Sequence, residues 1–278
     1  MSSESLPDSL DIAGRARVAV QEPLERQMEP LGRPALMALA AKPGECILDI
    51  GCGAGQQTLE LADAVGPSGR VLGIDISARL LDVARDRCAG RGAATFVEAD
   101  AGTFPFAAGG YDAAFSRFGV MFFVDPVAAF LNIRRALKPD GRLAFVCWRA
   151  FDENELDYLP LNAAVPHLPL PPPPDSGAPG PFAFAEADRL RSILAAAGFE
   201  EVAVAPHDQR VGSDGLEATL EVLLQVGALG RIIRENPQWR EAVVEPVRAA
   251  LAMRNGPDGV KLNAATWIVT ARCKPENP

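Results

Sequence analysis

The feature that most constrains the fold is a regular alternation of strand-like and helix-like segments that begins at Glu45. A short apolar run at 46–50 leads through a glycine-dense turn into a helical pattern at 56–65, and a second apolar run covers 70–75. Two strands joined by one helix at this spacing form a βαβ unit, whose strands are parallel. The alternation therefore predicts an α/β protein with a doubly wound, mostly parallel sheet.

The same alternation continues along most of the chain. It predicts helices at 77–88, 126–137 and 186–197, and strands at 94–98, 111–117, 142–148, 201–205 and 264–273. Lys138-Pro139-Asp140-Gly141 is expected to end a helix and turn the chain, because proline cannot continue a helix and glycine permits a left-handed turn. The sheet is thus expected to extend nearly to the end of the chain.

The remaining segments lack this alternation. We divide the chain into an N-terminal helical segment (1–44), a core (45–148), a Pro-rich lid or loop (149–185), a core continuation (186–212), a helical cap insertion (213–255), and a last strand and tail (256–278). The first dozen residues are expected to be disordered, and 15–41 to form short helices interrupted by Pro23, Pro30 and Pro34. The Pro-rich tract 166–181 favours polyproline II and is either a stiff surface linker or a lid over a pocket.

The helical insertion carries leucines and isoleucines at helical spacing. Residues 216–251 are expected to form two or three helices broken at Gly227, Gly230 and Pro237. Apolar residues at this spacing must be buried, either against the carboxyl edge of the sheet as a cap or against a second subunit in a homodimer. Both interpretations remain open at this point.

Charge and composition exclude several classes of protein. The 278 residues include 27 Lys and Arg against 36 Asp and Glu, a formal charge of −9, so no basic field draws the chain to nucleic acid or anionic lipid. No apolar run approaches the roughly 18 residues of a membrane span, and the N-terminus lacks a signal-peptide pattern, which predicts a cytoplasmic protein. The five cysteines are unevenly spaced and predict neither disulfides nor a zinc site.

The first strand runs into a glycine-dense turn, Asp49-Ile50-Gly51-Cys52-Gly53-Ala54-Gly55. Glycines at alternate positions let the backbone approach a ligand, and the following helix offers N–H groups to an anionic or polar group. The dinucleotide fingerprint G-x-G-x-x-G requires glycine where this chain has Gln56, which disfavours a nicotinamide or flavin enzyme. Cys52 has no neighbour that marks it as a nucleophile and is interpreted as a structural thiol.

Three aspartates follow successive strands of the predicted sheet. Asp49 precedes the glycine turn, Asp75 closes the second strand and Asp100 follows the third. Each alone could cap a helix or a turn, but together they lie at the carboxyl edge, where open α/β sheets bind ligands. Because a carboxylate at the second strand end can accept hydrogen bonds from ribose hydroxyls, the set predicts a nucleoside site.

These motifs together resemble a known family. The turn 49–55, with 73–77, 98–101, 111–112 and 137–143, is similar to the motif set of class I S-adenosylmethionine-dependent methyltransferases, and most of all to the ubiquinone and menaquinone C-methyltransferase group. The resemblance covers 44–148. It implies a Rossmann-like methyltransferase fold with seven strands, of which the last, 264–273, is antiparallel, and it implies S-adenosylmethionine as the cofactor.

The resemblance also implies roles for individual residues. Gly51 and Gly53 would pass close to the amino acid end of the cofactor, Asp75 would hold the ribose, and Asp100 and Ala101 would contact adenine. The remaining members of the implied cofactor set are Ile76 against adenine, Ser116 and Arg117 near the methionine end, and Asp49, Cys52 and Gly55 in the turn.

The expected reaction is methyl transfer to an O, C or N atom of a small molecule by in-line displacement. Alignment in a dry pocket supplies most of the rate, and a base helps only if the acceptor must lose a proton. Candidate catalytic residues are His167 and Tyr158, and candidate substrate residues are Phe118, Phe122 and Arg149; for each, an ordinary packing or solvated role is the alternative. Two other functions stay open: a non-catalytic S-adenosylmethionine-binding or assembly protein, and a methyltransferase of a peptide carboxylate.

Overall fold

The computed structural model describes residues 6–168 and 178–274. The chain forms two compact units, each built from segments far apart in the sequence. Unit 1 comprises Met1–Leu31, Ala150–Asp175 and Asp208–Ala265, and unit 2 comprises Gly32–Arg149, Ser176–His207 and Thr266–Pro278. The two units are described separately below, and only for the described residues.

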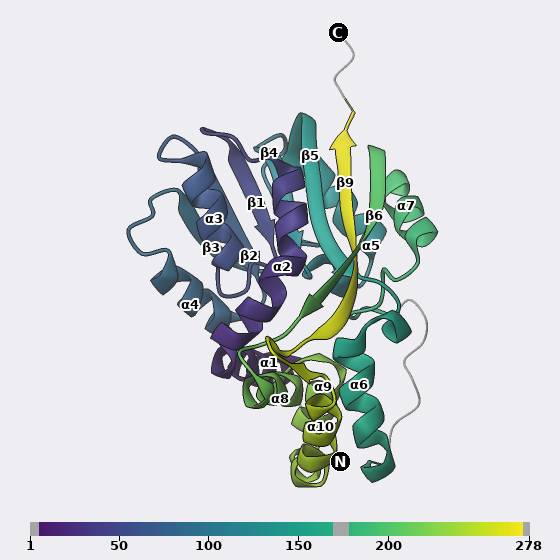
Figure 1. Cartoon of the computed structure of the whole chain (residues 1–278). Helices are drawn as coiled ribbons and strands as arrows, with labels where there is room; N and C mark the ends of the chain where they lie inside the picture. Colours follow the sequence, from purple (N-terminus) through teal and green to yellow (C-terminus); the bar gives the residue numbers. More distant parts are fainter. Residues whose placement is uncertain (1–5, 169–177, 275–278) are drawn as a thin grey trace. The chain divides into compact units, whose positions relative to one another are not determined.

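Unit 2 contains most of a seven-stranded sheet of order β3-β2-β1-β4-β5-β9-β6; the last residues of β6 and the first residues of β9 belong to unit 1 (Figure 1). The strands are β1 (Cys46–Ile50), β2 (Arg70–Asp75), β3 (Ala94–Glu98), β4 (Tyr111–Arg117), β5 (Leu137–Trp148), β6 (Phe199–Val211) and β9 (Leu262–Cys273). Neighbouring strands from β3 to β5 are parallel, whereas β9 runs antiparallel to β5. The predicted doubly wound sheet, mostly parallel with an antiparallel last strand, is confirmed.

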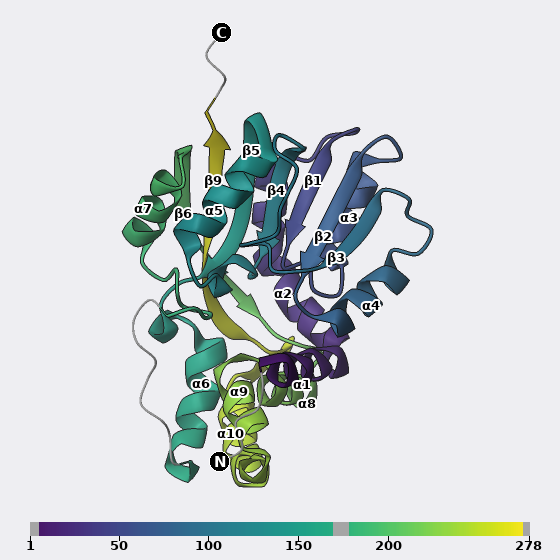
Figure 2. The same ribbon diagram turned by 180° about the vertical axis from the view of Figure 1, so that it is seen from behind.

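Helices cover both faces of this sheet. Figure 1 shows α2 (Gln21–Leu39) and α3 (Gln56–Val65) on the near face, and Figure 2 shows α5 (Pro126–Ala136) and α7 (Ala187–Ala196) on the other. A further helix, α4 (Ala78–Arg87), packs beside α3 and contacts β2 and β3.

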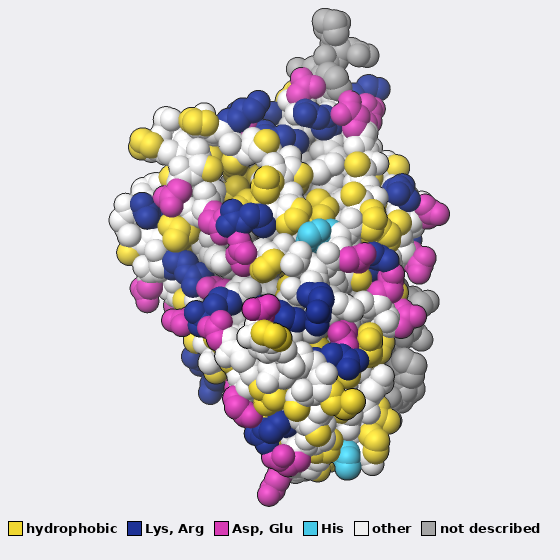
Figure 3. Space-filling view, viewed as in Figure 1, with side chains coloured by type: hydrophobic (Ala, Val, Ile, Leu, Met, Phe, Trp, Pro, Cys, Tyr) yellow, Lys and Arg dark blue, Asp and Glu magenta, His cyan; other side chains and the backbone are white. Residues whose placement is uncertain are grey.

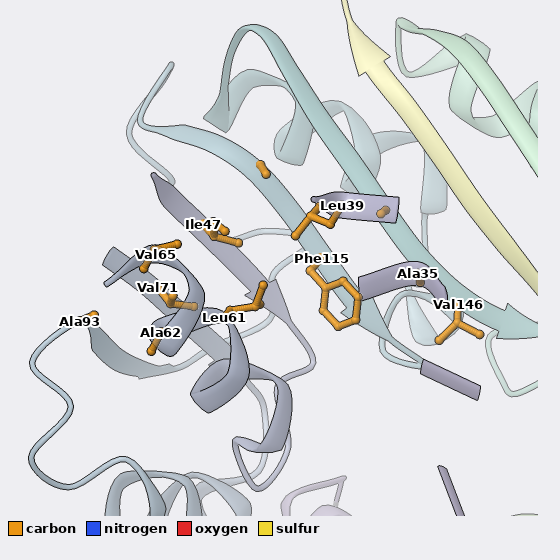
Figure 4. Packing of buried hydrophobic residues seen from close by; sticks show 12 residues of the cluster. Ala35, Leu39, Ile47, Leu61, Ala62, Val65, Val71, Ala93, Phe115 and Val146 are labelled. Carbon is orange, nitrogen blue, oxygen red and sulfur yellow. The ribbon is translucent and has the colours of Figure 1, made fainter. Parts of the chain in front are cut away.

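The core beneath α2 and α3 is apolar and closely packed. Figure 4 shows Ala35 and Leu39 of α2 and Leu61 of α3 directed at Ile47 of β1 and Phe115 of β4. All five side chains are at most 1% exposed. Burying one large apolar side chain contributes about 1.5–3 kcal/mol to the free energy of unfolding. This cluster is therefore a main source of stability for unit 2.

The N-terminal segment differs from the prediction. The first dozen residues are not all irregular, because α1 (Leu6–Ala19) begins at Leu6, and α2 is one continuous helix rather than several short ones. Pro30 and Pro34 each remove one backbone hydrogen bond from α2. Burial of the apolar face of this helix, which includes the fully buried Leu31, offsets that loss.

The expected turn at 138–141 is also different. Strand β5 starts at Leu137, directly after α5, so these residues lie at an irregular beginning of the strand where the register shifts between Tyr111 and Ala113. Asp140, with a φ of 59°, takes the left-handed conformation that we expected of Gly141. Aspartate tolerates this conformation because its side chain can bond to nearby backbone.

Unit 1 is mainly helical. It contains α1, α6 (Glu155–Ala164), α8 (Leu216–Gln225), α9 (Gly227–Glu235) and α10 (Arg240–Ala252), with a two-stranded ribbon of β7 (Asn255–Gly256) and β8 (Gly259–Val260). Helix α6 lies in the segment predicted as a lid or loop, and it includes Pro160. Gly230 does not break a helix, since α9 runs through it and the break falls at Val226.

The apolar residues of the helical insertion are buried within the chain itself. Leu220, Leu223, Leu224, Leu229 and Ile232 are between 1% and 7% exposed. They lie on α8 and α9, which contact each other, α6 and α10. These residues therefore need no second subunit to cover them.

Several buried polar side chains hold unit 1 together. Asn154 accepts a hydrogen bond from the Ala265 N–H at 2.8 Å and donates to the Ala150 carbonyl at 2.9 Å. Glu155 accepts from the Asn263 N–H at 3.0 Å and pairs with Arg254. These bonds tie the first turn of α6 to the end of α10 and the approach to β9.

Three further properties bear on the predicted class. Within 6–168 and 178–274, no helix is long and apolar enough to cross a membrane, and no group of three or more His, Cys, Asp or Glu could hold a metal ion. All five cysteines are free. Figure 3 shows basic and acidic side chains interspersed over the visible face, without a broad area of one sign.

Candidate functional site

The predicted cofactor residues lie at one edge of the sheet because the parallel strands end at similar levels. Ile50 pairs in register with Ile74, Asp49 with Phe115, and Asp75 with Glu98. The loops that follow these strands therefore meet at the carboxyl edge of unit 2, as the sequence predicted.

The glycine turn is held by backbone bonds to the neighbouring strand. The N–H groups of Gly51 and Cys52 donate to the Ile74 carbonyl at 2.8 and 3.2 Å. Gly51, Gly53 and Gly55 all have positive φ values, of 65°, 53° and 77°. Side chains are strained in that conformation, so glycine is favoured at all three positions.

The three glycines nevertheless face different surroundings within the protein. A Cβ at Gly51 would lie 2.7 Å from the Cα of Gly119, and a Cβ at Gly55 would lie 2.8 Å from the Cβ of Ala84 on α4. A Cβ at Gly53 would meet no atom within 4 Å. Gly51 and Gly55 thus serve close packing, and only Gly53 borders open space.

Asp75 faces the glycine turn. Its Oδ2 accepts a hydrogen bond from the Gly53 N–H at 2.9 Å, and its Oδ1 accepts one from the Ser77 N–H at 2.9 Å. Each carboxylate oxygen has a second lone pair, so this half-buried group can accept further bonds from a ligand. The adjacent Ile76 is 47% exposed and offers an apolar surface beside it.

Asp100 and Ala101 lie in a hydrogen-bonded loop after β3. The Asp100 side chain accepts a bond from the Gly102 N–H at 2.7 Å, while the Asn132 side chain on α5 donates to the carbonyls of Ala101 at 3.2 Å and Phe104 at 2.9 Å. Asp100 is exposed and Ala101 is buried. The loop thus keeps a carboxylate at the sheet edge in a fixed position.

Ser116 joins the loops that follow β1 and β4. Its hydroxyl donates to the Ile50 carbonyl at 2.8 Å and accepts from the Gly119 N–H at 3.2 Å. Gly119 was not singled out from the sequence, although it packs directly on Gly51. A glycine shortly after the fourth strand was the available signal, but its partner is far away in the chain.

Asp49 is buried beneath the turn, 1% exposed, and accepts a hydrogen bond from the Thr58 hydroxyl at 2.5 Å. Burial raises the pKa of Asp49 to about 7, and the charge of Asp75 adds to this, while the Thr58 bond and the Arg117 charge oppose it. Burial also raises the pKa of Cys52, together with the nearby Asp49 and Asp75 charges, so its side chain is a neutral thiol.

Arg117 extends from the end of β4 to the beginning of α3. Its Nη1 donates to the Gln56 side chain at 2.8 Å. Its aliphatic stem packs against Gly32, where an added Cβ would lie 2.7 Å from the Arg117 Cδ. Gln56 stands where the dinucleotide fingerprint has glycine. The structure therefore gives the residue that breaks that fingerprint a defined partner.

The candidate substrate residues lie near the ends of β4 and β5. Phe118 has a φ of 59° and stacks on Trp148 with ring centroids 4.3 Å apart. Phe122 is 46% exposed, and the Arg149 guanidinium lies 5.0 Å from the centre of the Trp267 ring. A bulky residue in the left-handed conformation is strained, and such strain is concentrated at functional sites.

Most of the Pro-rich tract, residues 169–177, lies outside the described residues, so its interpretation as linker or lid stays a prediction. The segment that follows is attached to unit 2 at two points. The Gly180 N–H donates to the Met121 carbonyl at 3.1 Å, and the Trp267 indole N–H donates to the Ala185 carbonyl at 2.8 Å.

The two candidate catalytic residues belong to unit 1. Tyr158 is half-buried on α6, and His167 is exposed at the end of a short 3-10 helix, Val165–His167. The glycine turn and the three aspartates belong to unit 2. Unit 2 thus contains the predicted cofactor and substrate residues, but not these two.

Comparison with known proteins gives this arrangement a family. The family model described as a methyltransferase domain matches residues 47–141, which span the strands from β1 into the beginning of β5. Residues 47–141 are a methyltransferase domain. The class I S-adenosylmethionine-dependent type inferred from the motifs is thereby confirmed, and with it S-adenosylmethionine as the cofactor of such domains.

Curated relatives resemble this domain and its flanks. An uncharacterised protein of a Streptomyces fradiae transposon is 43% identical over 129 residues, 46% of this chain and 37% of the relative. A 2-phytyl-1,4-naphtoquinone methyltransferase of Synechococcus elongatus is 37% identical over 48% of this chain and 62% of its own length. The ubiquinone/menaquinone biosynthesis C-methyltransferase of Ectopseudomonas mendocina is 33% identical over 43% and 52%. The chain spans about half the length of these relatives.

Solved structures share the fold of the methyltransferase domain. A protein described under the conversion of a disulfide bond into a thioacetal group during echinomycin biosynthesis has a TM-score of 0.59 at 20% identity, over 98% of this chain and 94% of that chain. The YcgJ protein from Bacillus subtilis has a TM-score of 0.57 at 16% identity, over 88% and 98%.

Proposed function

We propose that this protein is an S-adenosylmethionine-dependent methyltransferase that acts on a small-molecule acceptor. The observation that carries the proposal is the pairing of Gly53, whose missing side chain borders open space, with Asp75, whose carboxylate is fixed beside it at 2.9 Å. This geometry fits a ligand that passes close to the backbone and presents hydroxyl groups to a carboxylate.

Different residues of unit 2 would contact different parts of the cofactor. Asp75 would accept hydrogen bonds from the ribose, Asp100 and the Ala101 N–H would contact adenine, and the exposed Ile76 would pack against the ring. The amino acid end of the cofactor would lie against Gly51 and Gly53. The rest of its surroundings would be Asp49, Cys52 and Gly55 behind these glycines, and Ser116 and Arg117 at the end of β4.

Bound S-adenosylmethionine supplies an activated methyl group on a positively charged sulfur. The chain contributes fixed positions: Ser116 bonds the loop after β4 to β1, and Asp75 bonds the glycine turn to β2. Such preorganisation favours transfer reactions in which alignment and exclusion of water provide most of the acceleration.

We infer that the acceptor is a flat, largely apolar molecule of the quinone type. Two of the similar relatives carry names of quinone methyltransferases. In unit 2, the exposed Phe122 and the Phe118–Trp148 stack lie at or just after the ends of β4 and β5 and support an apolar acceptor. Arg149, whose guanidinium lies over the Trp267 ring, would orient an anionic oxygen.

A screen for S-adenosylhomocysteine formation tests the proposal. Purified protein is supplied with S-adenosylmethionine and, separately, with quinols, phenols, carboxylates and amines, after calorimetry has established cofactor binding. We expect binding of S-adenosylmethionine and turnover with an aromatic acceptor. No binding would contradict the proposal, and binding without turnover on any acceptor would favour the non-catalytic alternative.

The same assay tests the two candidate bases. If Tyr158 or His167 removes a proton from the acceptor, Tyr158→Phe or His167→Ala lowers kcat and alters its pH dependence, with unchanged cofactor affinity. A role in packing would instead change the free energy of unfolding and leave the pH profile of kcat in place.

A further inference from the structure

Asp49 has a more specific place in the site than contact with a ligand. Its carboxyl group lies at the end of β1, behind the backbone of the glycine turn, and it is 1% exposed. The Thr58 hydroxyl, from the first turn of α3, is the hydrogen-bond donor to it at 2.5 Å. Because Asp49 is buried, it can act on a ligand through the charge of its carboxylate rather than through direct contact.

The ionisable groups that interact with Asp49 lie on β4, on β2, in the glycine turn and at the end of α4. Arg117 of β4 favours its carboxylate form, whereas Asp75 of β2 opposes it. The remaining neighbours are Cys52 in the turn and Cys88 at the end of α4, and the pKa of each thiol is raised, which keeps both neutral. Because burial raises the pKa of Asp49 to about 7, the charge on its carboxyl group can change near neutral pH.

This titration matters because the two forms of the cofactor differ by one charge. S-adenosylmethionine carries a positive sulfonium, whereas its product, S-adenosylhomocysteine, carries a neutral thioether. We propose that Asp49 determines how strongly the site prefers the charged methyl donor over the neutral product, through the charge of its buried carboxylate. This inference rests on the proposed function, because it requires that unit 2 bind both forms.

The test is the ratio of two dissociation constants, measured by calorimetry from about pH 5.5 to about pH 8.5. We expect the ratio of the S-adenosylhomocysteine Kd to the S-adenosylmethionine Kd to rise with pH by on the order of tenfold, as one charge pair in a partly buried site permits. The amino group shared by both ligands also titrates, but it affects both constants and largely cancels in the ratio.

Variants identify the group responsible. Asp49→Asn keeps an acceptor for Thr58 and should make the ratio independent of pH. Thr58→Val removes the hydrogen bond that favours the carboxylate, so it should move the midpoint of the rise to higher pH. Asp188→Asn is the matched control, because this fully exposed aspartate on α7 carries the same charge change, and it should reproduce the native profile.

The outcomes separate this inference from the proposed function. If neither ligand binds, the proposed function fails. If both bind with a ratio that does not depend on pH, or if Asp49→Asn retains the native profile, Asp49 does not discriminate the two forms. Should Asp49→Asn fail to fold, the direction of the Thr58→Val shift decides, because a purely structural threonine would leave the midpoint in place.

Discussion

The two compact units use polar side chains in opposite ways. In unit 2, Asp75 and Asp100 accept hydrogen bonds from backbone groups of loops at the sheet edge, and Asp75 is half-buried while Asp100 is exposed. In unit 1, Asn154 and Glu155 are buried and bond to backbone far away in the chain. The polar groups of unit 2 thus hold loops at the sheet edge, where we propose the cofactor site, whereas those of unit 1 hold segments together.

This difference predicts that substitutions in the two units affect different quantities. Changes at the sheet edge of unit 2 should affect ligand affinity more than the free energy of unfolding. Changes at the buried polar groups of unit 1 should do the reverse. Four predictions test this contrast, from the largest expected effect to the smallest.

Gly53→Val should reduce S-adenosylmethionine affinity on the order of a hundredfold or more, because the new side chain enters the space beside the turn and strains a positive φ. The fold should persist, since no atom lies within 4 Å of the new Cβ. Gly109→Val is the matched control, with a φ of 63° and equally open surroundings. Calorimetry compares the two, and equal affinities would show that the space beside Gly53 is not the cofactor site.

Asp75→Ala should weaken binding by about 1.5–3 kcal/mol for each charge-assisted bond lost to the ligand. The change also releases the Gly53 and Ser77 N–H groups that the carboxylate now holds. Asp75→Asn keeps one carbonyl oxygen and should fall between the native protein and Asp75→Ala. An unchanged dissociation constant for Asp75→Ala would remove this residue from the site.

Asn154→Ala should lower the free energy of unfolding by about 2 kcal/mol, because the buried Ala265 N–H loses its acceptor. Urea denaturation measures the loss, and S-adenosylmethionine affinity should stay within about twofold of native, as expected for independent sites. Asn263→Ala, at an exposed side chain of the same region, is the control. A fall in affinity as large as that of Asp75→Ala would place unit 1 in the cofactor site and break the contrast.

Asp157→Asn should have the smallest effect on the free energy of unfolding, and at high pH it should stabilise the protein rather than destabilise it. Burial raises the pKa of Asp157, although its bond from the Ala228 N–H opposes this, so the ionised form costs stability as pH rises above the ordinary carboxyl pKa. Relative to native protein, the variant should gain up to about 1 kcal/mol at pH 8 and nothing at pH 4. Denaturation at both values checks this, and a difference that is the same at both would mean that ionisation of Asp157 does not limit stability.

The order of strands and helices in the sheet, and the edge at which Asp49, Asp75 and Asp100 meet, could be predicted from the amino-acid sequence. Apolar runs, helical periodicity and the spacing of Asp49, Asp75 and Asp100 are local signals, and parallel strands bring their carboxyl ends together without further information. Positive φ at Gly51 and Gly53 was likewise predictable, since glycine is favoured wherever a tight turn opens a helix. The motif resemblance added the cofactor.

Which of these residues border open space and which serve packing could be seen only in the folded chain. Gly51 meets Gly119, Gly55 meets Ala84, and Asp49 meets Thr58, and none of these contacts leaves a signal in local sequence. The same holds for α2, which continues through its prolines because its apolar face is buried. Local preferences amount to about 1–3 kcal/mol, so contacts between distant segments override them wherever burial or a buried hydrogen bond contributes as much.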